Sequence, residues 1–251
     1  MGLPERRDRI DDYFEALASQ LREAARDEAG SLREAARIVA DALSADGLVF
    51  AFGSGHSRFI AAELTWRAGG LAPVVAIEDP SHGAAERVEG YAASFLETYD
   101  IGPRDAVFVV SHSGINPVPL EVAQHASTSG ATVIAVTSRA HSERTVSRHS
   151  SGQKLFEVAD LVLDTHVPFG DAALPLGDAG WRVAATSTAV ATALLNAVVA
   201  QSAQMLLDAG RQPPVLVSSN VPGGDEHNRR LADTLWPRLT HFPRRGSSSA
   251  A

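Results

Sequence analysis

Two short segments combine serine hydroxyls, glycines and a histidine, a composition that suits an anion-binding loop. The first is Gly53-Ser54-Gly55-His56-Ser57 and the second is Ser111-His112-Ser113-Gly114. Glycines let the main chain approach a phosphate closely, while hydroxyls and the free N–H groups at a helix start donate hydrogen bonds to it. Helix capping would explain one such segment well but both together poorly. The predicted phosphate ligands are Ser54, Gly55, His56, Ser57, Ser111, His112, Ser113 and Gly114.

Nearby carboxylates and histidines could perform acid–base chemistry on the carbon skeleton of the ligand. Glu78 and His82 lie in a turn-rich segment after an apolar run, and Glu63 and Glu89 lie in helix-like stretches. A positioned acid or base typically contributes about 10²–10⁴-fold to a rate, and histidine titrates near neutral pH. We predict these four residues as catalytic candidates. Ordinary structural roles remain open: an ion pair for Glu63, solvent exposure for Glu89 and a loop hydrogen bond for His82.

Three further polar residues are predicted to contact the rest of the ligand. Asn116 follows the second serine segment, and His166 lies two residues after the apolar run that ends at Asp164. Asn220 is the first residue of the glycine-rich stretch 220–228. An ordinary surface turn is the alternative for that stretch. Its adjacent Asp, Glu and His at 225–227 resemble metal ligands only loosely, because neighbouring residues rarely converge on one ion. We therefore predict no metal and no cofactor.

The elements that must position these residues alternate along the chain. Five short apolar runs are separated by helix-like stretches near 57–69, 84–99, 117–129 and 152–159. Because the runs are apolar on both faces, they indicate an α/β fold with a five-stranded parallel sheet flanked by helices. Ligands bind beyond the carboxyl ends of such strands, where both serine segments fall. The predicted strands are Leu48–Phe52, Pro73–Ile77, Ala106–Ser111, Thr132–Thr137 and Leu161–Asp164.

Helices are predicted at both ends of the sheet region. Residues 5–44 show helical apolar spacing, with a break at Gly30 and Ser31 as the second N-cap. A Pro/Gly-rich loop, 166–180, precedes a long apolar helix, 181–209, and 215–218 is a short extended segment. We predict N-terminal helices (1–44), a ligand-binding domain (45–210) and a C-terminal extension (211–251), whose last residues, 246–251, form a disordered tail.

Composition narrows the functional class. The 251 residues carry a formal net charge of −8, which disfavours nonspecific nucleic-acid binding. The absence of cysteine excludes disulfides and thiolate catalysis. The charged start, 1–12, argues against a signal peptide. No apolar run reaches the roughly 20 residues of a membrane span. We predict a cytoplasmic protein that binds neither nucleic acid nor membrane.

A dinucleotide-binding loop is the main rival interpretation of the first serine segment. That pattern needs a third glycine where this chain has Arg58, so the match fails. Glu78 lies about 25 residues further on and could still act as the acidic residue that binds the ribose of a dinucleotide. Dinucleotide binding therefore remains an alternative interpretation. The Walker pattern and the G-x-S-x-G elbow are absent.

On both serine segments the chain resembles the sugar isomerase (SIS) domain family, over roughly residues 30–210. The resemblance implies a flavodoxin-like three-layer fold, serines that hold a phosphosugar, and a homodimer or higher homo-oligomer. Ala62-Glu63-Leu64-Thr65 resembles phosphoheptose isomerases. The segment before it is one helical turn shorter than in those isomerases, and no histidine that matches theirs follows within 181–209. The resemblance therefore does not imply the metal that phosphoheptose isomerases bind. The stretch 83–90 resembles N-acetylmuramic acid 6-phosphate etherases, whose glutamates carry over to Glu63 and Glu89.

The whole chain looks most like an SIS group that includes N-acetylglucosamine 6-phosphate dehydratase-like proteins. This resemblance implies a lyase that removes the C2 proton of an N-acetylhexosamine 6-phosphate and eliminates its C3 substituent by acid and base carboxylates. An aldose–ketose isomerase is the enzymatic alternative. A non-catalytic sugar-phosphate sensor is the other, although the first 44 residues look too short and acidic for a helix-turn-helix domain.

Overall fold

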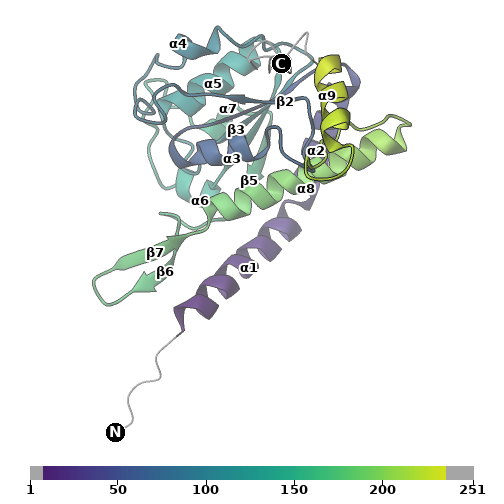
Figure 1. The fold of residues 1–251 in the computed structure, drawn as a ribbon. Helices are drawn as coiled ribbons and strands as arrows, with labels where there is room; N and C mark the ends of the chain where they lie inside the picture. Colours follow the sequence, from purple (N-terminus) through teal and green to yellow (C-terminus); the bar gives the residue numbers. More distant parts are fainter. Residues whose placement is uncertain (1–7, 236–251) are drawn as a thin grey trace, which may run out of the picture.

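The computed structural model describes residues 8–235, which are coloured in Figure 1. Its main sheet has five parallel strands in the order β2-β1-β3-β4-β5. Each predicted strand is confirmed to within one residue at either end. The strands are β1 (Val49–Gly53), β2 (Val74–Ile77), β3 (Ala106–Val110), β4 (Thr132–Thr137) and β5 (Leu161–Asp164). The predicted tail, 246–251, lies outside the described residues.

Both faces of the sheet are covered, which explains why its strands are apolar throughout. Alternate residues along a strand point to opposite faces: Val49 and Ala51 belong to one buried cluster, and Phe50 and Phe52 to the other. The first cluster is shared with α2 (Ala29–Ser44), α3 (Arg58–Glu63) and α8 (Ser187–Asp208), and the second with α4 (Ala93–Leu96), α5 (Pro117–Thr128) and α7 (Leu155–Val158). The predicted α/β class is therefore confirmed.

The strand order creates a crevice between β1 and β3. The chain leaves β1 for β2 on one side and returns to β3 on the other side. Such a reversal is where open parallel sheets bind ligands. Gly53 at the end of β1 is level with Val110 at the end of β3. The two serine segments therefore leave neighbouring strands at the same height.

The helices predicted around the first crossover are shorter than expected. The stretch 57–69 forms a 3-10 turn, η1 (Gly55–Ser57), followed by the six-residue α3. The stretch 84–99 is mostly turns and ends in the four-residue α4. Gly90, within this stretch, has a φ angle of 84°, and His82 and Gly83 directly before it have φ angles of 52° and 95°; an α-helix cannot contain that geometry. The predicted helices at 117–129 and 152–159 do form, as α5 and the short α7.

Two predictions about the flanking segments are wrong. The helix expected from 181 begins only at Ser187, because β6 (Ala172–Leu176) and β7 (Trp181–Ala185) form an antiparallel hairpin. The N-terminal helices divide at Glu28, not at Gly30. Gly30 lies inside α2 with open space around it, where a helical glycine costs about 1 kcal/mol. In Figure 1 the hairpin and α1 (Arg9–Asp27) extend from the body together, and the Tyr13 hydroxyl donates to the Ala185 carbonyl.

The C-terminal extension is more helical than expected. Val215 pairs with Leu71 in an isolated antiparallel bridge, which is the only strand-like pairing assigned within the predicted extended segment 215–218. The glycine-rich stretch 220–228 is only partly a turn, because α9 (Gly224–Leu235) begins within it. A side chain at Gly224 would lie 2.1 Å from the Ser218 carbonyl oxygen, so this tight entry requires glycine. The remaining helix, α6 (Arg139–Ser142), follows β4.

The long helix α8 corrects the expectation that nothing reaches the length of a membrane span. By length and composition alone, its 22 residues could cross a membrane. The helix packs against the first buried cluster through Ala191, Leu195 and Val198, as core helices do. One such helix is therefore weak evidence for a membrane span.

Candidate functional site

In the first serine loop, Ser54 has a structural role and the Ser57 hydroxyl is available to a ligand. The Ser54 hydroxyl is buried and donates to Oδ2 of Asp79 at 3.3 Å. The Ser57 N–H donates to the Ser54 carbonyl, and a side chain at Gly53 would lie 2.2 Å from the Ser57 carbonyl oxygen. Within the described part of the chain, the Ser57 hydroxyl has no protein partner. Ser57 is therefore the residue of this loop best suited to hold a ligand.

The second serine loop is arranged in the same way, with one structural serine and one serine available to a ligand. Ser111 is buried, and its hydroxyl accepts a hydrogen bond from the Gly114 N–H at 3.2 Å. The His112 carbonyl accepts from the Thr137 hydroxyl at 3.3 Å and from the Ser138 N–H at 3.1 Å, so the end of β4 holds the loop. Among residues 8–235, nothing pairs with the Ser113 hydroxyl. Ser113 is thus the counterpart of Ser57.

Asp79 fastens the first loop to the turn that follows β2. Its Oδ1 accepts from the N–H and the hydroxyl of Ser81, and its Oδ2 accepts from the Gly83 N–H and the Ser54 hydroxyl. Burial alone would raise the pKa of Asp79, but these hydrogen bonds outweigh burial and lower the pKa. The carboxylate is therefore ionised and structural at neutral pH. Sequence reasoning did not select it.

The start of α5 offers fewer free donors than a typical helix N-terminus. Pro117 and Pro119 have no N–H, and the Val118 N–H donates to the Glu86 carbonyl at 3.2 Å. The N-cap residue Asn116 makes no side-chain cap. The second loop can therefore offer an anion its own hydroxyl and main chain rather than the start of α5.

Glu78 and His82 lie at a small cleft beside the first loop, whose volume of about 10 Å³ has room for roughly one water molecule. The cleft is lined by Glu78 and His82 together with Gly53, Gly55 and Arg58. Both candidates are exposed, and the Glu78 N–H donates to the Tyr99 hydroxyl at 2.8 Å. The structure thus brings these two predicted catalytic residues to the first serine loop.

Glu63 and Glu89 are engaged elsewhere. Glu63 at the end of α3 forms an ion pair with Arg67, the ordinary role that the sequence left open. Glu89 accepts hydrogen bonds from the hydroxyl and the N–H of Ser150, the latter at 2.9 Å. These two bonds lower the pKa of Glu89. Neither carboxylate contacts a serine loop through any interaction found in the described residues.

Of the three predicted ligand-contacting residues, only Asn116 lies beside the serine loops. Asn116 is buried directly after the second loop. His166 turns toward α1, and its Nε2 lies 3.0 Å from Glu28 Oε1. Asn220, four residues beyond the stretch 214–216 that pairs with residues 69–72, donates its N–H to the Ser218 hydroxyl. Residues 69–72 lead into the amino end of β2, whereas the serine loops follow the carboxyl ends of β1 and β3.

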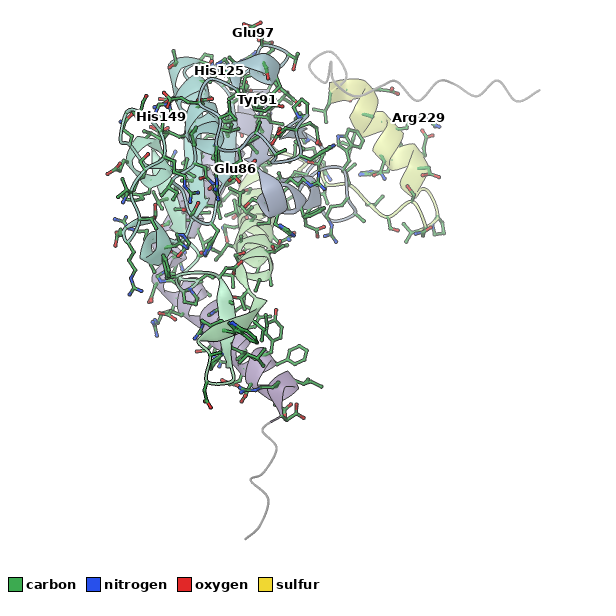
Figure 2. The ribbon with its side chains drawn as sticks, turned by 90° about the vertical axis from the view of Figure 1, so that its left-hand side faces the viewer. Glu86, Tyr91, Glu97, His125, His149 and Arg229 are labelled. Atoms are coloured by element: carbon green, nitrogen blue, oxygen red, sulfur yellow. The ribbon has the colours of Figure 1, made fainter. Side chains whose placement is uncertain are left out.

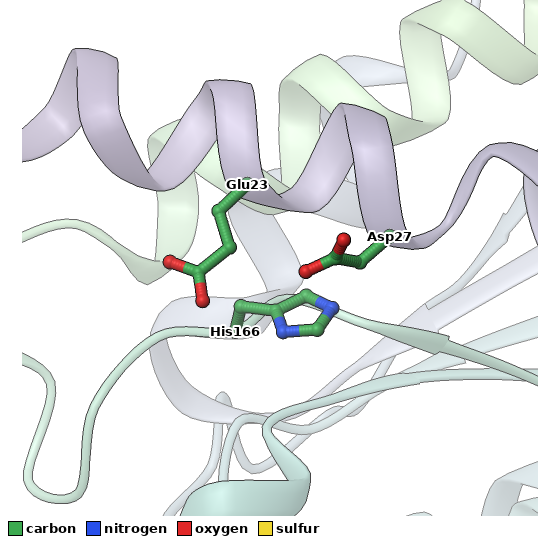
Figure 3. A group of neighbouring side chains, drawn as sticks. All are labelled: Glu23, Asp27 and His166. Atoms are coloured by element: carbon green, nitrogen blue, oxygen red, sulfur yellow. The ribbon is translucent and has the colours of Figure 1, made fainter.

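Glu23, Asp27 and His166 form a group whose ligand atoms lie within 4.8 Å of one another (Figure 3). The other interactions of these residues argue against a metal site. Both oxygens of Asp27 accept from Arg26, at 2.6 and 2.8 Å, and His166 pairs with Glu28. Exposed acidic groups of this kind are common without an ion. The group is better explained as a polar contact between α1 and the segment after β5.

The two histidines of the serine loops differ in environment. His56 is exposed, with its ring edge toward Phe59. Both ring nitrogens of His112 are buried and lack partners within the described residues, and its ring centroid lies 5.0 Å from that of His141. Burial lowers the pKa of His112, so the ring is neutral at neutral pH. A neutral His112 supplies no positive charge to a phosphate.

Glu86 is the carboxylate that sequence reasoning missed (Figure 2). It is half-buried, and its Oε1 accepts from Asn116 Nδ2 at 2.8 Å. The residue lies in the stretch 83–90 that resembles the etherases, but the helix predicted there gave no reason to choose it over Glu89. Its position depends on turns and on partners about thirty residues away, which periodicity does not reveal.

A family model described as SIS domain matches residues 12–138 of this chain. The UPF0309 protein of Geobacillus thermodenitrificans (strain NG80-2) is 42% identical over 239 residues, which cover 92% of this chain and 96% of that relative. The family match and the alignment with this relative both cover far more of the chain than the two serine loops.

Solved structures show the same fold at low sequence identity. A phosphoheptose isomerase from Francisella tularensis has a TM-score of 0.56 and 19% identity, over 78% of this chain and 97% of that chain. The Vibrio vulnificus NanR protein, solved in complex with ManNAc-6P, has a TM-score of 0.50 and 20% identity, over 92% of this chain and 69% of that chain.

Proposed function

The chain belongs to the SIS domain family, and on that premise we propose that it is a lyase that removes water from an N-acetylhexosamine 6-phosphate. The observation that carries the proposal is the pair of serine loops at the β1–β3 crevice. Ser57 and Ser113 both have hydroxyls without protein partners there, within residues 8–235. Two hydroxyl-bearing loops at one strand reversal suit a phosphate dianion.

The substrate class is supported by the ligand bound to a protein of the same fold. The NanR protein of Vibrio vulnificus was solved with ManNAc-6P, so this fold can accommodate an N-acetylhexosamine 6-phosphate. Elimination needs a base for the C2 proton and an acid for the C3 oxygen, and no redox step. Side chains at the crevice can supply both functions, so the proposal includes neither metal nor cofactor. We place the reaction in the cytoplasm.

The proposal is tested by incubating the purified protein with N-acetylglucosamine 6-phosphate without added metal. We expect a dehydrated product in which a C=C bond is conjugated with the aldehyde, detected by its ultraviolet absorbance and by NMR. The Ser57→Ala/Ser113→Ala variant should bind substrate at least about tenfold more weakly, because each hydrogen bond to a charged group contributes roughly 1.5–3 kcal/mol. Unchanged NMR spectra with several amino-sugar phosphates would contradict the proposal.

Aldose–ketose isomerisation is the second candidate, favoured by the likeness to the phosphoheptose isomerase fold. It starts from the same C2 proton abstraction, but the proton returns to C1 and no water leaves. Solvent deuterium that enters C1 or C2 without dehydration would select this reaction. A sensor would instead bind the sugar phosphate and leave it intact.

A further inference from the structure

The turn that follows β2 packs directly on the first serine loop. A side chain at Gly83 would lie 2.6 Å from the Gly55 main-chain nitrogen, so the two main chains are in contact. Gly83 has a φ angle of 95°, and its N–H donates to Asp79, which also holds Ser54. The main chain that leaves this contact reaches Glu86 three residues later. The Glu86 N–H donates to the Gly83 carbonyl at 3.2 Å.

Glu86 lies between the two serine loops and contacts the surroundings of both. Its Oε2 lies 3.9 Å from the position that a side chain at Gly55 would occupy, on the first loop. Its Oε1 accepts from Asn116, two residues beyond the end of the second loop. Its carbonyl accepts from the Val118 N–H in the first turn of α5. Side chain and main chain therefore both fix this carboxylate at the crevice.

A second layer of contacts orients the residue that holds Glu86. The Asn116 Oδ1 accepts from Arg148 Nη1 at 2.7 Å, and the Arg148 N–H donates to the Ile115 carbonyl at 2.9 Å. Because the guanidinium only donates, the Asn116 oxygen must face Arg148 and its amide N–H must face Glu86. This arrangement leaves Glu86 Oε2 without a hydrogen-bond partner among the described residues. An oriented carboxylate with one unpartnered oxygen is suited to take a proton from a ligand.

We propose that Glu86 is the base that removes the C2 proton in the reaction proposed above. The inference rests on that proposed function. The other carboxylates compete poorly, since Glu63 pairs with Arg67 and Glu89 with Ser150. Glu78 lines the cleft on the β2 side of the first loop, whereas Glu86 lies on the β3 side, between the loops.

The step balances with Glu86 as the only proton carrier. In the ring-opened sugar the aldehyde at C1 makes the C2 proton acidic, and the Glu86 carboxylate takes that proton as an enolate forms. The enolate electrons then form the C2=C3 bond while the C3–O bond breaks. Protonated Glu86 gives its proton to the departing oxygen, which leaves as water, and the carboxylate is regenerated.

The test compares Glu86→Gln with Glu97→Gln, an exposed glutamate at the end of α4. It uses N-acetylglucosamine 6-phosphate in D₂O and NMR detection of both dehydration and deuterium at C2. Glutamine keeps an oxygen to accept from Asn116, so the fold should be retained, and inorganic phosphate should bind both variants and the unaltered protein within about threefold. We expect Glu86→Gln to lose about 10²–10⁴-fold in both reactions, and Glu97→Gln to retain them.

The outcomes separate this inference from the proposed function. If the unaltered protein exchanges C2 hydrogen without dehydration and Glu86→Gln does not, the lyase proposal fails and Glu86 stands as the base. If Glu86→Gln reacts within about threefold of the unaltered protein, Glu86 is not the base, whatever the reaction. If the unaltered protein neither dehydrates nor exchanges, both proposals are overturned.

Asn116→Ala tests the positioning role of Asn116. Because Asn116 orients Glu86 and is not expected to hold the phosphate, its loss should lower kcat by about tenfold or more with little change in KM. Asn116→Gln, which can restore an amide donor, should recover part of kcat. A rise in KM with kcat unchanged would instead make Asn116 a substrate-binding residue and overturn the positioning role.

Discussion

Gly114 shows how little space the second serine loop leaves. Its φ angle is 63°, and a side chain there would lie 2.8 Å from the Thr137 hydroxyl oxygen and 3.1 Å from the Ser142 hydroxyl oxygen. Thr137 and Ser142 are themselves fully buried, so neither can move away without disturbing the end of β4. We predict that Gly114→Ala destabilises the fold and displaces Ser113.

Gly152 provides a matched control for that substitution. Its φ angle is 72° and nothing lies within 4 Å of the position of an added side chain. Gly152→Ala should therefore show only the conformational cost of about 1–2 kcal/mol. Gly114→Ala should lose clearly more in urea unfolding and should also bind inorganic phosphate more weakly. Equal losses of stability with unchanged phosphate binding would contradict the prediction.

His112 and His141 make stability depend on pH. Burial lowers the pKa of both imidazoles below the ordinary value of 6.5, which holds in the unfolded chain. For His112, Asp171 and Asp164 raise the pKa and His141 lowers it, but burial dominates. Below pH 6.5 the unfolded chain therefore binds more protons than the folded chain, and stability falls as the pH falls.

We expect the free energy of unfolding in urea to decrease from pH 7.5 to pH 5.5, and His112→Asn to show a shallower decrease. The substitution removes one group that titrates in the unfolded chain but resists protonation in the folded chain. Carboxylates common to both proteins cancel in this comparison. Identical slopes for the two proteins would show that His112 does not contribute.

At the scale of elements, the strands were predictable because their environment is uniform. Phe50 and Phe52 face one buried cluster while Val49 and Ala51 face the other, so every position must be apolar. The serine loops were predictable for a related reason, since strand ends fix where they lie. The prediction that residues 1–44, 45–210 and 211–251 form separate units remains a prediction.

The turns and the hairpin were not predictable from apolar spacing. The stretch 84–99 has helix-compatible composition, but the positive φ angle at Gly83 lies directly before it and that at Gly90 interrupts it. Glu86 was missed for this reason: its partner Asn116 is 30 residues away, and Arg148, which holds Asn116, is a further 32. The β6–β7 hairpin was read as loop and helix because β7 is exposed throughout and shows no alternation of burial.

The helix α8 supports the sheet through one face, which a pair of leucines can test. Leu195 is 1% exposed and packs against the first buried cluster, whereas Leu207, on the same helix, is 50% exposed. Leu195→Ala should lower the free energy of unfolding by about 2–5 kcal/mol, because it removes buried methyl groups and leaves a cavity. Leu207→Ala should cost much less. Similar losses in thermal and urea unfolding would contradict this account of α8.

At the scale of the molecule, the exposed apolar side chains gather on the parts that extend from the body. Phe14 on α1 is 64% exposed and Trp181 on β7 is 68% exposed, and the two elements are joined through Tyr13 and Ala185. Large exposed apolar patches usually mark an interface. A second copy of this chain is the expected occupant, because a twofold axis lets the same patch cover itself.

We therefore predict that the protein is a homodimer or a higher homo-oligomer, with α1 and the hairpin in the interface. Light scattering coupled to gel filtration should give at least twice the chain mass of 26.4 kDa. The Phe14→Asp/Trp181→Asp variant should shift toward 26.4 kDa, because it places charge in an apolar contact. Val146→Asp is the matched control, since Val146 is 85% exposed but lies on the segment after α6. A single-chain mass for the unaltered protein, or an equal shift for both variants, would exclude this interface.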